Sequence, residues 1–445
     1  MVKSNRRRSR LVVTADGRGV AAHAGARLLS DLADVVGLTD GLSAAMAPTK
    51  TRRRGHDRGQ VLVDVAVTIA DGGETISDLA VLRDQPVLFG PVASTPTAWR
   101  TLEAVDTAAL ERIAVARAAA RTRVWASGVD PGFYVIDFDG TLIGSHSDKQ
   151  GAAKTYKRGF GFHPLLAILD ATGEALAGVL RPGNAASNTT ADHIELLGLV
   201  LHQLPVDPDT TEVIVRADSA ALTHGFVDAC RQASVRFSIG YDLTATVRAA
   251  CLRVPARRWR PAVTADGADE RDGAEVAEIT DLIDLSRWPT GTRAIVRREE
   301  PHPGAQLTFT DVDGHRFQVF ITDLTDPDIA YLEALQRGRG RAEKRICDLK
   351  DTGLANLPSA DFAINTAWLT MSLVAHDLLC WTRLLVLTGD LANAEPKRLR
   401  YTVLHTAGLI ARSARRTRLR LAAGWPWAND LVAAFDRVRV LRLQT

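Results

Sequence analysis

The order of strand-like and helix-like segments between residues 133 and 243 most constrains how this chain folds. A β-branched and aromatic stretch, FYVIDFDGTLI at 133–143, comes first, and an apolar hairpin at 165–180 follows it. After the hairpin, the apolar periodicity predicts a helix at 190–204, a strand at 212–220, a helix at 223–235 and a strand at 236–243. Three strands followed by alternating helices and strands predict an α/β fold with an RNase H-like catalytic core.

Differences in apolar periodicity and charge divide the rest of the chain into regions around this core. We expect a helical, basic unit at 1–125 that binds the DNA ends, the first part of the core at 130–245, a β-rich insertion at 246–316, the second part of the core at 317–395 and a basic helical C-terminal region at 396–445. The apolar run 366–388 contains His376, Asp377 and Arg383, so it predicts a buried helix and not a membrane span.

The charges are distributed unevenly along the chain. Residues 1–60 hold 12 Lys and Arg against 5 Asp, and residues 396–445 hold 11 against 2. With 55 basic and 52 acidic residues in total, 32 basic and 45 acidic residues remain between these ends. Basic ends around an acidic middle favour a polyanion bound at the periphery, with acidic chemistry at the centre. Solvated charged faces are the simpler interpretation of either end alone.

The cysteines and the N-terminus indicate a cytoplasmic protein. The four cysteines are far apart, with no close pair to bind zinc and no disulfide framework. Asp16 and Arg18 interrupt the apolar residues after the basic start, so no signal peptide is expected.

Three carboxylates stand where a two-metal site would need them. Asp139 ends the first strand, Asp218 ends the fourth, and Glu343 lies on the helix predicted after the insertion. Mg²⁺ or Mn²⁺ prefers hard oxygen ligands that converge from different elements. Asp137 is two residues before Asp139 and faces the same side of a strand, so we expect it to be an auxiliary ligand. A single Asp at a strand end is more often a cap or a surface group.

With these carboxylates in place, the chain resembles the bacterial insertion-sequence transposases of the DDE class, particularly the cut-and-paste group with a β-strand insertion before the third carboxylate. The resemblance lies in DFDGTLIGSHSDKQGAAKTYKRGFGFHPLLA, LRPGNAASNTTADHI, VRADSAALTHGFVDA and GRGRAEKRICDLKD. It implies metal-dependent cleavage of DNA at the element ends, strand transfer into target DNA, and a homodimer in the complex with double-stranded DNA.

In that group the third carboxylate commonly belongs to a Tyr-x2-Arg-x3-Glu-x6-Lys pattern. Arg339, Glu343 and Lys350 match it, whereas Gln336 stands in the place of Tyr. Steps of four and seven residues put the three matching side chains on one helical face, where Arg339 and Lys350 can bind DNA phosphates. Ordinary charge pairing on a solvated helix is the alternative.

Further basic and aromatic residues are candidates for DNA contacts. Lys154, Lys157 and Arg158 form a glycine-flanked basic strip after the first strand, and Arg52, Arg53 and Arg54 form a cluster in the N-terminal unit. Trp259 lies among arginines, and it is either a base-stacking residue or a buried structural residue, with Trp288 as the alternative.

Two other functions fit parts of the sequence. VIDFDGTLI also matches the opening motif of haloacid-dehalogenase-type phosphatases, in which Asp137 would be the nucleophile. Against this, 130 residues precede the motif and a phosphatase leaves the basic ends unexplained. The second alternative is a DNA-binding protein without catalysis, which a metal-dependent nicking assay would distinguish.

Overall fold

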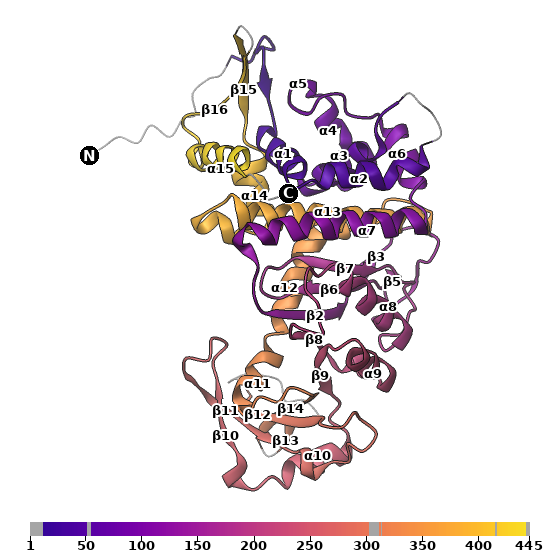
Figure 1. The fold of residues 1–445 in the computed structure, drawn as a ribbon, viewed down its shortest axis with the longest axis vertical. Coiled ribbons are helices and arrows are strands. Elements are labelled where there is room, and N and C mark those ends of the chain that lie inside the picture. The colour runs from indigo at the N-terminus through magenta and orange to yellow at the C-terminus, as the bar shows by residue number, and fades with distance from the viewer. Residues whose placement is uncertain (1–11, 51–54, 302–310, 313, 414–415, 442–445) are drawn as a thin grey trace, which may run out of the picture.

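The computed structural model describes residues 12–50, 55–301, 311–312, 314–413 and 416–441. Figure 1 shows three tiers along the long axis of the molecule. The N-terminal helices and the C-terminal region form one end, the first strands of the core lie in the middle, and the inserted strands form the other end. One sheet therefore runs through the two lower tiers.

This sheet is mixed, and its strand order is β10-β11-β12-β14-β9-β8-β2-β6-β7, with β13 paired to β14. The core strands are β2 (Tyr134–Gly140), β6 (Leu165–Leu169), β7 (Ala175–Val179), β8 (Val213–Ala217) and β9 (Arg236–Tyr241). β2, β8 and β9 are parallel, whereas β6 and β7 are antiparallel to their neighbours. The helices α8 (Thr190–Leu201) and α9 (His224–Gln232) connect β7 to β8 and β8 to β9. The predicted succession of elements is present.

The region between β9 and the second part of the core extends the same sheet. Its elements are α10 (Ala245–Leu252), β10 (Arg260–Val263), β11 (Glu270–Glu278), β12 (Arg293–Glu299), β13 (Asp311–Val312) and β14 (His315–Thr322). β14 pairs antiparallel with β9, so the inserted strands continue the core sheet past its edge and do not form a separate layer. A smaller sheet, β3-β5-β4, contains β3 (Ile143–Gly144), β4 (Ala153–Lys154) and β5 (Phe160–Phe162).

The described N-terminal part consists mainly of helices. Its helices are α1 (Arg27–Val35), α2 (Leu38–Met46), α3 (Arg58–Ala70), α4 (Ala80–Arg83), α5 (Pro86–Phe89), α6 (Thr95–Glu103) and α7 (Thr107–Val124). Of these, α1, α3, α6 and α7 pack on α13 (Phe362–Leu385), the helix predicted to be buried, and most of its side chains are indeed buried. No helix in the described part of the chain is long and apolar enough to cross a membrane.

The C-terminal region differs from the predicted helical one. It contains α14 (Pro396–Leu399) and α15 (Ala428–Val440), but β15 (Gly408–Ser413) and β16 (Arg416–Leu421) form a hairpin between them. The short strand β1 (Val20–Ala21) pairs with β15. Ile410 and Leu419 pack on apolar residues of the N-terminal part. In residues 416–421, RTRLRL, every second residue is an arginine, and this alternation favours a strand over a helix.

Candidate active site

Asp139 and Asp218 lie next to each other at the ends of two parallel strands. β2 and β8 pair in parallel up to Phe138 and Ala217, and the next residue of each strand is the aspartate. Neighbouring strands are about 4.8 Å apart, so this register puts the two carboxylates at one edge of the sheet. Asp218 also accepts a hydrogen bond of 3.0 Å from the Ala220 amide, which fixes the turn that follows β8.

Three other predicted site residues, Asp218, Arg339 and Glu343, affect the pKa of Asp139. Burial raises the pKa of Asp139 to about 6, and the negative charges of Asp218 and Glu343 act in the same direction. Arg339 opposes them, with its Nη1 3.7 Å from Asp139 Oδ2. Three carboxylates therefore act on one another with a single arginine at an ion-pair distance.

Glu343 reaches this edge from a helix that crosses the sheet. The sequence predicts one long helix here, but the structure has two, α11 (Ile329–Arg337) and α12 (Gly340–Leu349). Arg341 of α12 forms an ion pair with Asp170, which directly follows β6. Glu343 is exposed, and it has no hydrogen bond or ion pair with the residues that the structure describes. Its carboxylate is thus open to a ligand.

The helix breaks at Gly338 because a buried arginine passes beside it. A Cβ on Gly338 would lie 2.5 Å from Nη1 of Arg216, which donates a hydrogen bond to the Leu335 carbonyl. Gln336, in the place of the expected Tyr, donates to the Ala217 carbonyl at 3.1 Å and accepts from Ser238 Oγ at 2.7 Å. Gln336 therefore ties α11 to β8 and β9.

Asp137 is not an open ligand in this structure. It is 1% exposed, and its two oxygens accept hydrogen bonds of 2.6 and 2.7 Å from Arg216 Nε and Nη2. Its expected role as an auxiliary metal ligand does not fit this pairing, because both oxygens are already occupied. Arg216 was missed from the sequence, although an arginine inside the apolar strand VIVRA predicts a buried partner.

Two open clefts meet at Asp218. One, of about 500 Å³, is lined by Arg337 and Arg339, and the other, of about 650 Å³, by Lys154 and residues 183–188. Ser219 and Asp242 line both. The edge that carries the carboxylates is thus accessible from two sides.

The comparisons with known proteins identify the family. The model of the transposase DDE domain group 1 family matches residues 3–443. The chain belongs to this family. Among solved structures, the piggyBac transposase synaptic complex with hairpin DNA, determined by cryo-EM, is similar with a TM-score of 0.41 and 8% identity, over 85% of this chain and 80% of that chain. No curated protein matches the sequence.

The family does not favour the phosphatase interpretation, and the pairing of Asp137 argues against it as well. A phosphatase needs Asp137 as a free nucleophile, whereas here Asp137 is buried and held by Arg216. The motif VIDFDGTLI therefore matches only by local sequence.

The remaining candidates for DNA contacts in the DDE domain differ in accessibility. Lys154, Lys157 and Arg158 are exposed beside the second cleft, and Lys350 is half-buried at the end of α12. Arg52, Arg53 and Arg54 lie outside the described residues.

Trp259 does not fit a base-stacking role in this structure. It is 8% exposed, and the Arg298 guanidinium lies over its ring at 4.1 Å from the centroid. The structural alternative for Trp259 agrees with this packing. Trp288, the other candidate, stacks on His224 with centroids 4.1 Å apart.

The donor set fits a divalent cation. All three donors are carboxylates, the ligand type that Mg²⁺ and Mn²⁺ prefer, and one arginine does not balance their charge. Their oxygens do not all lie within 4.8 Å of one another, so binding of one ion by all three requires a carboxylate side chain, such as the exposed Glu343, to move. Because it is exposed, the Glu343 side chain can change rotamer.

Proposed function

We propose that this chain is the transposase of a bacterial insertion sequence, which cleaves DNA at the element ends and transfers the ends into target DNA. In this proposal, Asp139, Asp218 and Glu343 are the ligands of the divalent metal site. The strand order β7-β6-β2-β8-β9, with the last three strands parallel, supports an RNase H-like core. The adjacent positions of Asp139 and Asp218 at the ends of β2 and β8 carry the proposal.

When bound, Mg²⁺ or Mn²⁺ would supply an activated water or hydroxyl nucleophile and stabilise the charge on the leaving oxygen. The side chains of the chain have complementary roles. Arg339 lies at ion-pair distance from Asp139, and with a cation held by the carboxylates its guanidinium would be available to bind a DNA phosphate. Arg216 keeps Asp137 paired, so the rigid end of β2 presents Asp139 alone.

Double-stranded DNA would lie along the clefts beside Asp218. Lys154, Lys157 and Arg158 are exposed on one side and Arg339 lies on the other. A second basic surface is the β15–β16 hairpin. There Arg416, Arg418 and Arg420 share one exposed face, opposite the face that carries Leu419. Two separated basic surfaces suit a protein that binds element ends and target DNA, as a homodimer in the DNA complex.

The test is metal-dependent cleavage of DNA that carries the ends of the element, taken from the sequence flanking the gene. We expect Glu343→Gln to lower the cleavage rate at least about a thousandfold, or about 4 kcal/mol in activation free energy. DNA binding, measured by anisotropy in Ca²⁺, should change less than about threefold, because the basic surfaces carry it.

The matched control is Glu103→Gln, an exposed glutamate on α6 far from the carboxylates. It should cleave at the wild-type rate. Near-normal cleavage by Glu343→Gln would contradict the assignment of the third carboxylate. Binding of end DNA by the wild type with no cleavage in Mg²⁺ or Mn²⁺ would instead favour a DNA-binding protein without catalysis.

A further inference from the structure

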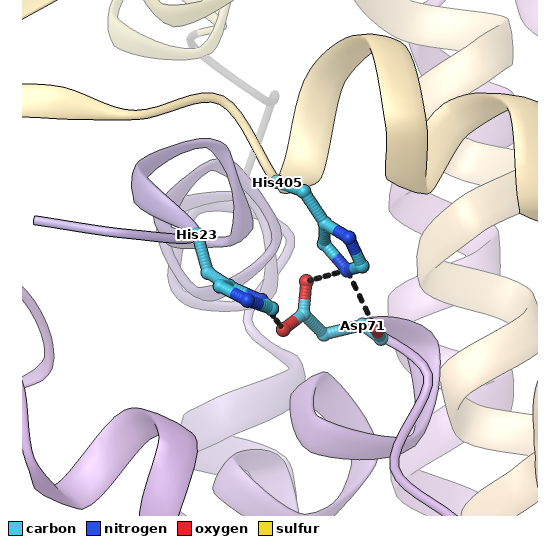
Figure 2. A group of neighbouring side chains, drawn as sticks. All are labelled: His23, Asp71 and His405. Carbon is cyan, nitrogen blue, oxygen red and sulfur yellow. Dashed lines mark hydrogen bonds and ion pairs between the residues drawn. The ribbon is translucent and has the colours of Figure 1, made fainter. Parts of the chain in front are cut away.

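A second cluster of metal-ligating side chains lies away from the three carboxylates, at the junction of the two ends of the described chain (Figure 2). His23 lies between β1 and α1, Asp71 ends α3, and His405 follows the helical turn Arg400–Leu404. The Asp71 carboxylate lies between the two imidazole rings. Three segments that are distant in sequence therefore meet at one point.

The ligand atoms are close enough to share one ion. His23 Nδ1 is 2.5 Å from Asp71 Oδ2, and His405 Nε2 is 3.3 Å from Asp71 Oδ1. All three ligand atoms lie within 4.8 Å of one another, and no other such group occurs among the described residues. Ligands about 2.0 Å from a tetrahedral ion are about 3.3 Å apart, so only small shifts are needed.

A buried oxygen in the cluster lacks a hydrogen bond. The Asp71 side chain is 4% exposed, and its Oδ1 accepts no hydrogen bond within the described structure. The neighbouring His405 Nε2 donates a hydrogen bond of 2.9 Å to the Asp71 backbone carbonyl, and it lies 3.3 Å from Oδ1. Among the described residues this longer contact is the only partner of the buried Oδ1, and a bound cation would satisfy this oxygen more fully.

We infer that His23, Asp71 and His405 form a structural Zn²⁺ site. Two imidazoles and one carboxylate are ligands typical of Zn²⁺, whereas Mg²⁺ prefers oxygen ligands alone. A water molecule would complete a tetrahedral set from the half-exposed side of the histidines. This site is chemically distinct from the three carboxylates, and the inference does not depend on the proposed function.

The nearby Arg400 does not occupy the place of the cation. Its Nε donates to the Ala70 carbonyl at 3.0 Å, and its Nη2 donates to the Asp351 carbonyl. The guanidinium thus bonds backbone oxygens on either side and leaves the Asp71 carboxylate to the histidines. Zn²⁺ would fix the base of β15 to the end of α3 and to the segment before α1.

The test uses the full chain with Asp139→Asn as the parent, so that the catalytic carboxylates cannot account for binding. After the metal is removed, calorimetry should show one equivalent of Zn²⁺ bound. The melting temperature should rise by several degrees with Zn²⁺, because a ligand of the folded state stabilises it. Mg²⁺ at the same concentration should produce neither effect.

Two variants remove one ligand each and keep local structure. His405→Gln retains a donor toward Asp71, and His23→Asn suits the left-handed backbone of His23, where φ is 52°. Each should weaken Zn²⁺ binding at least about a hundredfold, since one of three protein ligands is lost. The control, His202→Gln, removes an exposed histidine that bonds only its own helix and should bind as the parent does.

X-ray absorption at the zinc edge of the parent gives a measurement that does not depend on how the variants fold. It should show scattering from two imidazoles with the remaining ligands oxygen. Sulfur ligands, no uptake of Zn²⁺ by the parent, or parent-like binding by both His405→Gln and His23→Asn would overturn the inference.

Discussion

Two clusters of charge in this molecule are built in opposite ways. Between α7 and α13, Arg117 and Arg121 face Asp377 and Glu174, and all four side chains are almost completely buried. At the sheet edge, Asp139, Asp218 and Glu343 are partly open to solvent, and only Asp139 has an arginine, Arg339, at ion-pair distance. The first cluster is balanced in charge, and the second is not.

The difference distinguishes buried, paired charges that stabilise the fold from accessible charges that are available to bind a ligand. Glu174 accepts hydrogen bonds from Arg121, Trp125 and Trp381. Although burial alone would raise the pKa of Glu174, the charge of Arg121 and the hydrogen bonds from Trp381, Thr172 and Arg121 lower it below its usual value. Asp139 has too few such partners, and its pKa is raised to about 6. An excess of one charge at an accessible edge is typical of a functional site.

The largest effect should come from breaking the balanced cluster. Arg121→Met should lower the free energy of unfolding by about 3–5 kcal/mol, because it leaves Glu174 and Asp377 buried with too few donors. Chemical denaturation measures the change. Arg100→Met, at an exposed arginine on α6, should cost less than about 0.5 kcal/mol. Equal costs for the two would show that the buried cluster does not hold the helices to the core.

Asp64 on α3 is a third case, because it is a buried carboxylate for which no ion pair occurs among the described residues. Burial raises its pKa to about 7, Gln60 donates one hydrogen bond of 3.1 Å, and the charge of Asp34 adds to the increase. In the unfolded chain the pKa is near 3.8, so folding takes up a proton between these values. The stability that Asp64 contributes is present below pH 3.8 and is lost as the pH rises through about 7.

Asp64→Asn should therefore match the wild type near pH 4 and exceed it at pH 8. A tenfold change in proton affinity is worth about 1.4 kcal/mol, so the gain should be about 2–4 kcal/mol. Denaturant unfolding across this pH range measures it. Asp40→Asn, at an exposed position of α2, should show no such pH dependence. A constant difference between Asp64→Asn and the wild type would contradict the assigned pKa.

The smallest expected effect concerns the position of Glu343 relative to Asp139 and Asp218. Gly338→Ala places a Cβ 2.5 Å from Arg216 and 3.0 Å from the Leu335 carbonyl, so it should cost about 1–3 kcal/mol of stability. It should also slow DNA cleavage, because α12 and Glu343 must shift. Gly340→Ala is the matched control, since nothing lies within 4 Å of its added Cβ. Unchanged cleavage by Gly338→Ala would show that this close approach does not position Glu343.

Local pattern was sufficient to predict the order of the core elements. The apolar strand at 133–143 and the alternating strands and helices after it are visible in the sequence, because burial on both faces demands continuous apolar runs. The same pattern placed Asp139 and Asp218 at strand ends. Their adjacency needed the parallel pairing of β2 with β8, which the structure provides.

What the sequence could not predict depends on contacts between distant segments. The break between α11 and α12 arises where Arg216 passes Gly338, and the pairing of Asp137 arises from the same arginine. The C-terminal region was predicted to be basic and helical, although RTRLRL in its hairpin alternates with a period of two. His23, Asp71 and His405 are far apart in the sequence and belong to no motif of fixed spacing, so local pattern could not bring them together.

The pairing of β1 with β15 constrains the order in which the chain can fold during its synthesis. Val20 pairs with Leu409, so the partner of this strand is synthesised almost 390 residues later. At about 5–20 residues per second, the N-terminal strand waits on the order of 20–80 s for it. The helices α1, α3, α6 and α7 wait similarly for α13, on which they pack. Until then their exposed apolar faces make the nascent chain a candidate for chaperone binding.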